Sequence, residues 1–301
     1  MGLMFIVGRA GSGKTHFCLR EIAQRQLKSS NEKLFYIVPE QYTLQAEKDL
    51  IGLTENGVIM RAQVLSFSRL CYNILSLNGG LNKTPLSDTG KALVIRKIIS
   101  ENMDKFLYFQ NCAGRFSFTE QVCATITELF KYGVSPENLS MSFENEMSSV
   151  MFMKAHDIGI IYKQFIKYMS EGYISSETSL DMLYSSMEDS SFVSDGEIWL
   201  DGFSSFTPQE LKIIERLIKS AKNVFITLTI NKASVNNPNL SETSVFYQTK
   251  KTYSQIVKLA EKIGVNVSVK YMGEPLRFKT DGLKNLENGF LYHNPSQNKC
   301  G

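Results

Sequence analysis

The feature that most constrains this chain is a glycine-rich loop near its N-terminus, placed between a strand pattern and a helix pattern. The loop reads Gly8-Arg9-Ala10-Gly11-Ser12-Gly13-Lys14-Thr15. The short apolar run Met4-Phe5-Ile6-Val7 precedes it, and residues 16–26 after it have a helical pattern. The eight residues match G-x-x-x-x-G-K-[ST] in the strand-loop-helix setting that this motif requires. The sequence therefore predicts a P-loop within an α/β fold.

Each residue type in this loop has a physical role in binding a phosphate chain. Glycines adopt backbone angles that are closed to other residues, which lets successive N–H groups turn toward one anion. The helix that begins near Gly13 directs the positive end of its dipole to the same place. We expect Lys14 to reach the β- and γ-phosphates of ATP, and the Thr15 hydroxyl to bind Mg²⁺. The alternative is a glycine-rich turn that binds nothing.

The composition limits the kind of protein without defining its function. The chain has 301 residues, 43% of them hydrophobic, which suits one large domain or two modest ones. No apolar run is long enough to span a bilayer and the first residues do not resemble a secretory signal, so no membrane partner is expected. A net charge of +3 permits nucleic-acid binding through a local patch. The five cysteines lack metal-binding spacing and indicate reduced thiols of a cytoplasmic protein.

Strand and helix patterns alternate in residues 1–86 and 195–275. After the first strand, the strand candidates are residues 34–38, 63–67, 197–203, 223–230 and 265–271. The helices predicted between them are residues 44–53, 68–77, 211–219 and 241–262. The third of these follows a capping box, Thr207-Pro208-Gln209-Glu210. Such alternation implies a doubly wound parallel sheet, with a ligand at the carboxyl ends of its strands.

Residues 87–194 are predicted to form an inserted helical subdomain without a convincing strand. Its helices are expected at residues 89–102, from 117 to about 133, and at 150–168. The second begins with a capping box, Ser117-Phe118-Thr119-Glu120. Residues 276–301 become polar without closing an element, and we expect them to begin a linker to further domains of a longer protein.

A second candidate site residue is Asp201, which ends the predicted strand Ile198-Trp199-Leu200. A carboxylate at such a strand end can hold Mg²⁺ through water. A hydrolase usually adds an acid close by to activate the attacking water, but here Gly202 follows and residues 203–206 contain no acid. Loss of a positioned base lowers a rate on the order of 10²–10⁴-fold. The sequence therefore predicts a site that binds Mg·ATP and hydrolyses it poorly or not at all. The alternative for Asp201 is a strand-end turn residue.

Four sequence blocks, taken in order, resemble the N-terminal part of the B subunit of AddAB (RexAB) helicase-nucleases. They are Gly8 to Thr15, Val38-Pro39-Glu40-Gln41, Ala62-Gln63-Val64-Leu65-Ser66-Phe67-Ser68-Arg69-Leu70 and Trp199-Leu200-Asp201-Gly202-Phe203. The similarity runs along essentially the whole chain. It implies a superfamily 1 helicase-like first domain with an inserted helical subdomain. It also places Gly202 where the acidic motif of active relatives has a glutamate.

The resemblance implies the ATP-binding part of a heterodimer that processes double-strand DNA breaks for recombinational repair. The B subunit of this family is a degenerate helicase that binds ATP and contacts DNA, while the A subunit is the motor. In the whole family protein a nuclease domain and a four-cysteine iron–sulfur cluster follow, and neither lies in these residues. We therefore expect an N-terminal fragment with little or no ATPase activity and no nuclease activity.

Seven residues of the second and third blocks, or beside them, are candidates for contacts with DNA. They are Gln41, Tyr42, Arg61, Gln63, Ser66, Ser68 and Arg69. All lie near predicted strand ends on the nucleotide side. Hydroxyl groups and arginines there could hold phosphates, and Tyr42 could stack on a base. Each of them could equally be a solvated loop residue.

Two other functions remain open on the sequence. A catalytic P-loop kinase or small-molecule NTPase would need an acid delivered to the γ-phosphate from the helical insert, for which Glu120 and Asp157 are candidates. A non-enzymatic scaffold would carry the glycine loop as a vestige. Nucleotide binding and turnover distinguish these two from the helicase-nuclease interpretation.

Overall fold

The computed structural model describes residues 2–28, 32–54, 57–77, 84–141, 149–174, 180, 183–184, 187, 192–237, 239, 241–273 and 276–292. By its internal contacts the chain divides into two compact units. The first comprises residues 1–70, 190–206 and 214–301, and the second residues 71–189 and 207–213. The domain limits expected from the sequence stay a prediction.

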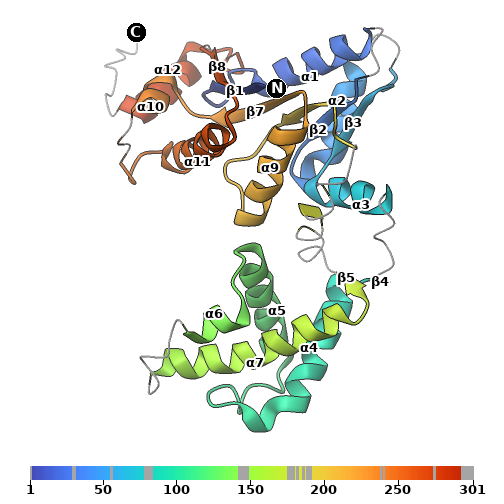
Figure 1. The fold of residues 1–301 in the computed structure, drawn as a ribbon. Coiled ribbons are helices and arrows are strands. Elements are labelled where there is room, and N and C mark those ends of the chain that lie inside the picture. Colours follow the sequence, from blue (N-terminus) through green and yellow to red (C-terminus); the bar gives the residue numbers. More distant parts are fainter. Residues whose placement is uncertain are drawn as a thin grey trace. The chain divides into compact units, whose positions relative to one another are not determined.

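A six-stranded, all-parallel sheet forms the centre of the first unit (Figure 1). Its strands are β1 (Gly2–Gly8), β2 (Leu34–Ile37), β3 (Ala62–Leu65), β6 (Glu197–Leu200), β7 (Asn223–Thr229) and β8 (Val267–Met272). They lie in the order β3-β2-β6-β7-β1-β8. Every residue of β2 and β6 is buried, because an inner strand of a parallel sheet is covered on both faces.

The helices of the first unit are α1 (Lys14–Gln26), α2 (Thr43–Gly52), α10 (Lys232–Asn236), α11 (Tyr247–Ile263) and α12 (Asp281–Tyr292), with the short 3-10 helix η1 (Glu40–Tyr42). Helices α1 and α2 pack on one face, where Ile22 and Leu50 share a core with Ile6. Helix α11 covers the other face, where the Tyr253 ring lies 4.7 Å from that of Phe5. Neighbouring strand residues point to opposite faces, so the predicted doubly wound α/β fold is confirmed.

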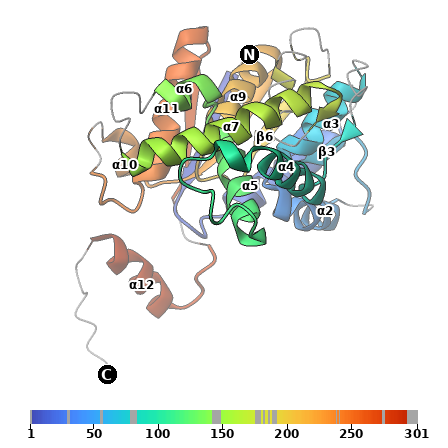
Figure 2. The same cartoon turned by 90° about the horizontal axis from the view of Figure 1, so that it is seen from below.

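The second unit is mainly helical. It contains α4 (Asp88–Asn102), η2 (Met103–Lys105), α5 (Phe116–Lys131), α6 (Pro136–Met141) and α7 (Val150–Ser170), while α3 (Phe67–Leu77) and α9 (Pro208–Ser220) cross the division between units. Helices α4, α5 and α7 pack together (Figure 2) around Ile95, Val122, Ile161 and Phe165. Although α7 has 21 residues, none of the helices in the described part of the chain has both the length and the apolar character needed to cross a bilayer.

The expectation that the insert lacks strands is wrong in one detail. Two-residue strands, β4 (Thr84–Pro85) and β5 (Tyr173–Ile174), pair in parallel in the second unit. Elements of this length carry no periodic pattern, because a period of two needs several residues to be recognised.

Three predicted helix starts have different outcomes. The capping box at Thr207 is confirmed: its hydroxyl accepts the Glu210 N–H at 3.2 Å, and the Glu210 carboxylate accepts the Thr207 N–H at 2.7 Å. The capping box at Ser117 is wrong, because α5 already begins at Phe116 after an Arg115 N-cap without a side-chain cap bond. The start predicted at residue 241 is also wrong. There the Ser241 hydroxyl accepts a nearby backbone N–H, and α11 begins only at residue 247 because such local bonds compete with helix formation.

Candidate functional site

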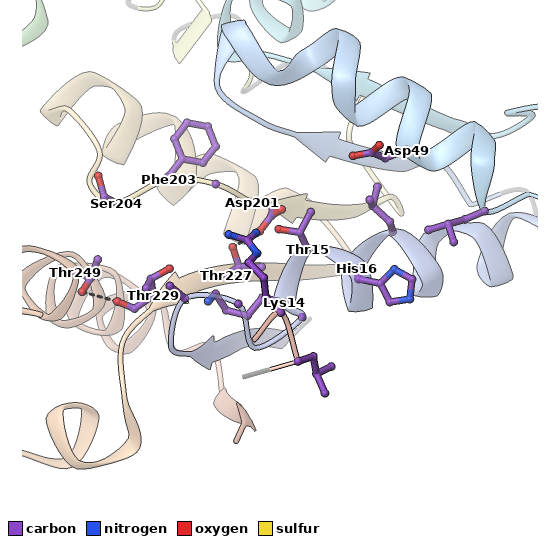
Figure 3. Close-up of a pocket in the computed structure, with 18 of the residues that line it drawn as sticks. Lys14, Thr15, His16, Asp49, Asp201, Phe203, Ser204, Thr227, Thr229 and Thr249 are labelled. Carbon is purple, nitrogen blue, oxygen red and sulfur yellow. Dashed lines mark hydrogen bonds between the residues drawn. The ribbon is translucent and has the colours of Figure 1, made fainter. Parts of the chain in front are cut away.

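A cavity of about 920 Å³ opens at the carboxyl ends of β1, β6 and β7 in the first unit. The loop Gly8–Thr15, hereafter the glycine loop, forms one wall together with the start of α1 (Figure 3). Residues 201–204 after β6 and two threonines of β7 form another wall. Ligands of open α/β sheets bind at this edge, so the structure brings the two predicted motifs to the expected place.

The glycine loop turns sharply into α1 at Gly13. This residue has φ of 83° and forms the N-cap of the helix, a left-handed conformation that glycine adopts without steric cost. Gly13, Lys14 and Thr15 all line the cavity. The first N–H groups of a helix have no partner within it and carry the positive end of its dipole. The wall at this point is therefore suited to an anion.

The ammonium group of Lys14 lies over the glycine loop. Its Nζ donates to the carbonyl oxygens of Gly8 at 2.8 Å and Arg9 at 2.9 Å. The pKa of Lys14 is lowered from 10.5 to about 8, chiefly because burial disfavours the charged form; Asp201 opposes this and Arg277 adds to it. A buried ammonium is stabilised by an anionic partner, so an anion bound in the cavity would raise this pKa.

Asp201 follows β6 directly and is 4% exposed. Its Oδ2 accepts the Tyr36 hydroxyl at 2.7 Å, and its Oδ1 accepts the hydroxyl of Thr227. Figure 3 shows the carboxylate between Thr15 and Thr227, and all three line the cavity. The structure thus brings Asp201 to the same cavity as Lys14 and Thr15.

Few acids surround this cavity. Among its described lining residues, the acids are Asp49 and Asp201. Asp49 lies on α2, is exposed, and accepts the Gln45 amide at 2.7 Å. Gly202 has φ of 84°, and a Cβ there would lie 3.4 Å from Pro39 Cδ. A glutamate at this position would therefore carry backbone strain.

The residues around the cavity fit a phosphate chain with its metal ion. Lys14 and Arg277 supply positive charge, and the helix start supplies N–H donors. The Thr15 hydroxyl and the Asp201 carboxylate offer the hard oxygen ligands that Mg²⁺ prefers. This donor set suits a phosphate chain carrying Mg²⁺.

Residues near the C-terminal end also line the cavity, and no sequence motif pointed to them. Leu276 and Arg277 belong to the wall, and the Arg277 N–H donates to the Gly11 carbonyl at 3.1 Å. The Arg9 guanidinium forms an ion pair with Glu287 of α12. Their region was expected to be a linker, so only the fold brings these residues to the glycine loop.

Five of the seven DNA candidates are exposed and lie on or after β2 and β3. They are Gln41, Tyr42, Gln63, Ser68 and Arg69. The Tyr42 side chain belongs to η1 and is 56% exposed. Arg69 forms an ion pair with Glu47 at 3.3 Å, in which its side chain stays 53% exposed. These side chains remain accessible to a ligand.

The other two DNA candidates already have partners in the fold. Ser66 is 2% exposed, and its hydroxyl accepts the N–H of Arg69 at the start of α3. The Arg61 guanidinium donates to carbonyl oxygens at and after the end of α1, among them Gln26 at 3.2 Å and Glu32 at 2.9 Å. It thereby satisfies carbonyls that a helix end leaves without partners.

The two acids proposed for a kinase, Glu120 and Asp157, do not line the cavity at the glycine loop. Asp157 is fully buried, and its two oxygens accept the backbone N–H groups of Leu107, Tyr108 and Phe109 at 2.8–2.9 Å. It serves the fold of the second unit, which removes it from that role. Glu120 lies on α5 and lines a different cavity, of about 430 Å³, in the second unit.

Comparisons with known proteins agree with the motifs. The family model described as "ADDB, N-terminal" matches residues 5–287. Three similar proteins are each named as the B subunit of an ATP-dependent helicase/deoxyribonuclease. The protein of Alkaliphilus oremlandii is 36% identical over 270 residues, covering 89% of this chain and 23% of its own length. That of Caldanaerobacter subterraneus is 36% identical over 297 residues, covering 97% and 25%.

The third relative, from Ruminiclostridium cellulolyticum, is 38% identical over 272 residues, covering 89% of this chain and 23% of the relative. The chain thus spans about a quarter of the length of these relatives. The family match nevertheless includes the glycine loop, the Asp201 block and most of both compact units. The chain therefore belongs to the family described as ADDB, N-terminal.

Proposed function

We propose that this chain is the ATP-binding N-terminal part of the B subunit of a heterodimeric helicase-nuclease that repairs double-strand DNA breaks. One observation carries the proposal: the glycine loop, Lys14, Thr15 and Asp201 line a single cavity at the carboxyl edge of a parallel sheet. The printed names of the relatives support an ATP-dependent role in DNA processing. Reduced thiols suit a cytoplasmic complex.

In this proposal the residues of the cavity have separate tasks. The N–H groups of the glycine loop and the Lys14 ammonium bind the phosphates. The Thr15 hydroxyl binds Mg²⁺ directly, and Asp201 holds it through water. When bound, the Mg²⁺ ion neutralises phosphate charge and fixes the orientation of the chain of phosphates. Lys14 releases the Gly8 and Arg9 carbonyls as it moves to the anion.

The same site is proposed to bind ATP without driving a motor. Gly202 supplies no base, and its backbone conformation disfavours one. Unwinding is therefore assigned to the partner A subunit, and nuclease chemistry to parts of the protein outside this chain, as is any iron–sulfur cluster. The DNA contacts are assigned to the edge beside β2 and β3. The candidates there are the exposed Gln41, Tyr42, Gln63, Ser68 and Arg69, because Ser66 is buried and Arg61, which precedes β3, already donates to carbonyl oxygens at the end of α1.

Titration of a fluorescent ATP analogue tests nucleotide binding. We expect Lys14→Ala to weaken binding roughly 10- to 100-fold, because a hydrogen bond to a charged group is worth about 1.5–3 kcal/mol. The control is Lys258→Ala, which removes an exposed lysine of α11 and should leave the affinity unchanged. Equal affinities of the parent and the Lys14 variant would contradict the proposal.

Steady-state phosphate release tests the second half of the proposal. We expect little ATP turnover by the chain, with or without single-stranded DNA, because Gly202 supplies no base beside Asp201. Brisk DNA-stimulated turnover would show that another residue activates water, and the argument from Gly202 would then be wrong.

A further inference from the structure

The Asp201 carboxylate is held by two hydroxyl groups, one from each neighbouring strand. Strand β6 lies between β2 and β7. Tyr36 in β2 donates to Oδ2 at 2.7 Å, and Thr227 in β7 donates to Oδ1. Each carboxylate oxygen thus has its own donor, so the carboxylate plane is fixed from both sides. This three-residue arrangement is hereafter the hydroxyl clamp.

The three side chains of the clamp have little exposure to solvent. Tyr36 is 1% exposed, Thr227 3% and Asp201 4%. A buried carboxylate needs hydrogen bonds, and bonds to an ionised acceptor are stronger than those between neutral groups. Both donors are neutral hydroxyls, so they orient the carboxylate without cancelling its negative charge. That charge remains available to a cation in the cavity, which Asp201 and Thr227 both line.

Lone pairs also remain for a ligand. An ionised carboxylate has about four acceptor positions, and the clamp occupies one on each oxygen. Burial, followed by the Asp201 charge, raises the pKa of Tyr36 well above its usual value. The phenol therefore keeps the proton that it donates to Oδ2.

We propose that Tyr36 and Thr227 are positioning residues that orient the Asp201 carboxylate toward the water shell of the Mg²⁺ ion carried by bound ATP. This inference rests on the proposed function of the cavity. Both hydroxyls act through Asp201, to which they donate. In other metal sites, hydrogen-bond partners behind the metal ligands fix the orientation of those ligands. The hydroxyl clamp has the same role toward Asp201.

A different role for the two residues would be packing alone, since Tyr36 belongs to the core beneath α1 and α2. The two roles predict different results. Packing supports the whole cavity, so its loss would weaken ATP binding with and without Mg²⁺ alike. Orientation of Asp201 concerns only the metal-bound form, so its loss would reduce only the gain in affinity that Mg²⁺ provides.

The test is the affinity for a fluorescent ATP analogue, measured on the whole chain in excess Mg²⁺ and again in EDTA. We expect Tyr36→Phe and Thr227→Val each to reduce the Mg²⁺-dependent gain on the order of 10-fold, as loss of such partners does in other metal sites. The affinity in EDTA should not change. Thr227→Ser keeps the hydroxyl and should restore most of the gain. Tyr253→Phe removes a phenol from α11 and serves as the matched control.

Thermal melting of each variant shows whether it is folded. Because Tyr36→Phe and Thr227→Val each remove one hydroxyl of the clamp, either variant alone can test the proposal if the other is unstable. Loss of the Mg²⁺-dependent gain in either folded variant, with rescue by Thr227→Ser, supports the clamp. If nucleotide binding weakens equally in Mg²⁺ and in EDTA, or if the Mg²⁺-dependent gain in affinity does not change, the clamp proposal is overturned while the proposed function stands. Absence of nucleotide binding by the parent chain would overturn the proposed function and the clamp together.

Discussion

Two buried aspartates, one in each unit, use their charge in opposite ways. Asp157 in α7 accepts three backbone N–H groups from residues 107–109 and is fully enclosed. Asp201 accepts two side-chain hydroxyls and borders a large cavity. The comparison teaches that burial of a carboxylate does not identify a site. What distinguishes Asp201 is unused acceptor capacity beside an open space.

The largest effect on stability is expected at Asp157. Replacing it by alanine leaves three backbone N–H groups without their acceptor, which costs on the order of 3 kcal/mol because each unsatisfied buried group costs about 1–3 kcal/mol. Urea unfolding followed by circular dichroism measures the loss. Asp104→Ala, at an exposed aspartate of the same unit, is the control. A loss no larger than that of the control would remove the contrast between the two aspartates.

Asp201→Asn should affect binding instead of stability. We expect the affinity for Mg·ATP to fall about 10-fold, while the affinity for ATP in EDTA stays equal or rises, because a negative charge facing the phosphates is removed. The two titrations that test the clamp measure this as well. Weaker binding in EDTA would mean that Asp201 supports the cavity generally, as Asp157 supports its unit.

Gly202→Glu places an acid beside Asp201. It tests whether an added carboxylate at this position is sufficient for ATP hydrolysis. We expect a stability loss of about 1–2 kcal/mol, because a side chain is forced into a left-handed conformation. We expect no gain in ATP turnover, because a base acts only when it is held within hydrogen-bond reach of the attacking water. Gly114→Ala, where a Cβ meets nothing within 4 Å, controls for the loss of a glycine. Measurable turnover by the variant would show that the site lacks only its base.

The smallest effect is a pH dependence that comes from Lys14, the cation facing Asp201. Its pKa in the free chain is lowered to about 8, and bound phosphates favour the protonated form. Binding must therefore take up a proton above pH 8, and affinity should fall as pH rises through that value. Titrations between about pH 7 and 9.5 measure this. Lys14→Arg should bind with little pH dependence, because arginine stays charged.

The sheet could be predicted because its buried strands are continuous apolar runs separated by helix patterns. The glycine loop and Asp201 could be placed at its carboxyl edge for the same reason. Tyr36 and Thr227 could not be predicted, because a polar atom within an apolar strand gives no sign of its partner until the strand order is known. Arg277 was missed because nothing in its surroundings resembles a motif, and two-residue strands are too short to show a period.

The strand order has a consequence for how the protein is made. Strand β1 takes both of its neighbours, β7 and β8, from the opposite end of the sequence. A growing polypeptide can therefore complete this sheet only after residue 272 has left the ribosome. Pairings between such distant segments close slowly, so the part of the sheet that carries the glycine loop, although it precedes the other strands in the sequence, is among the last to assemble.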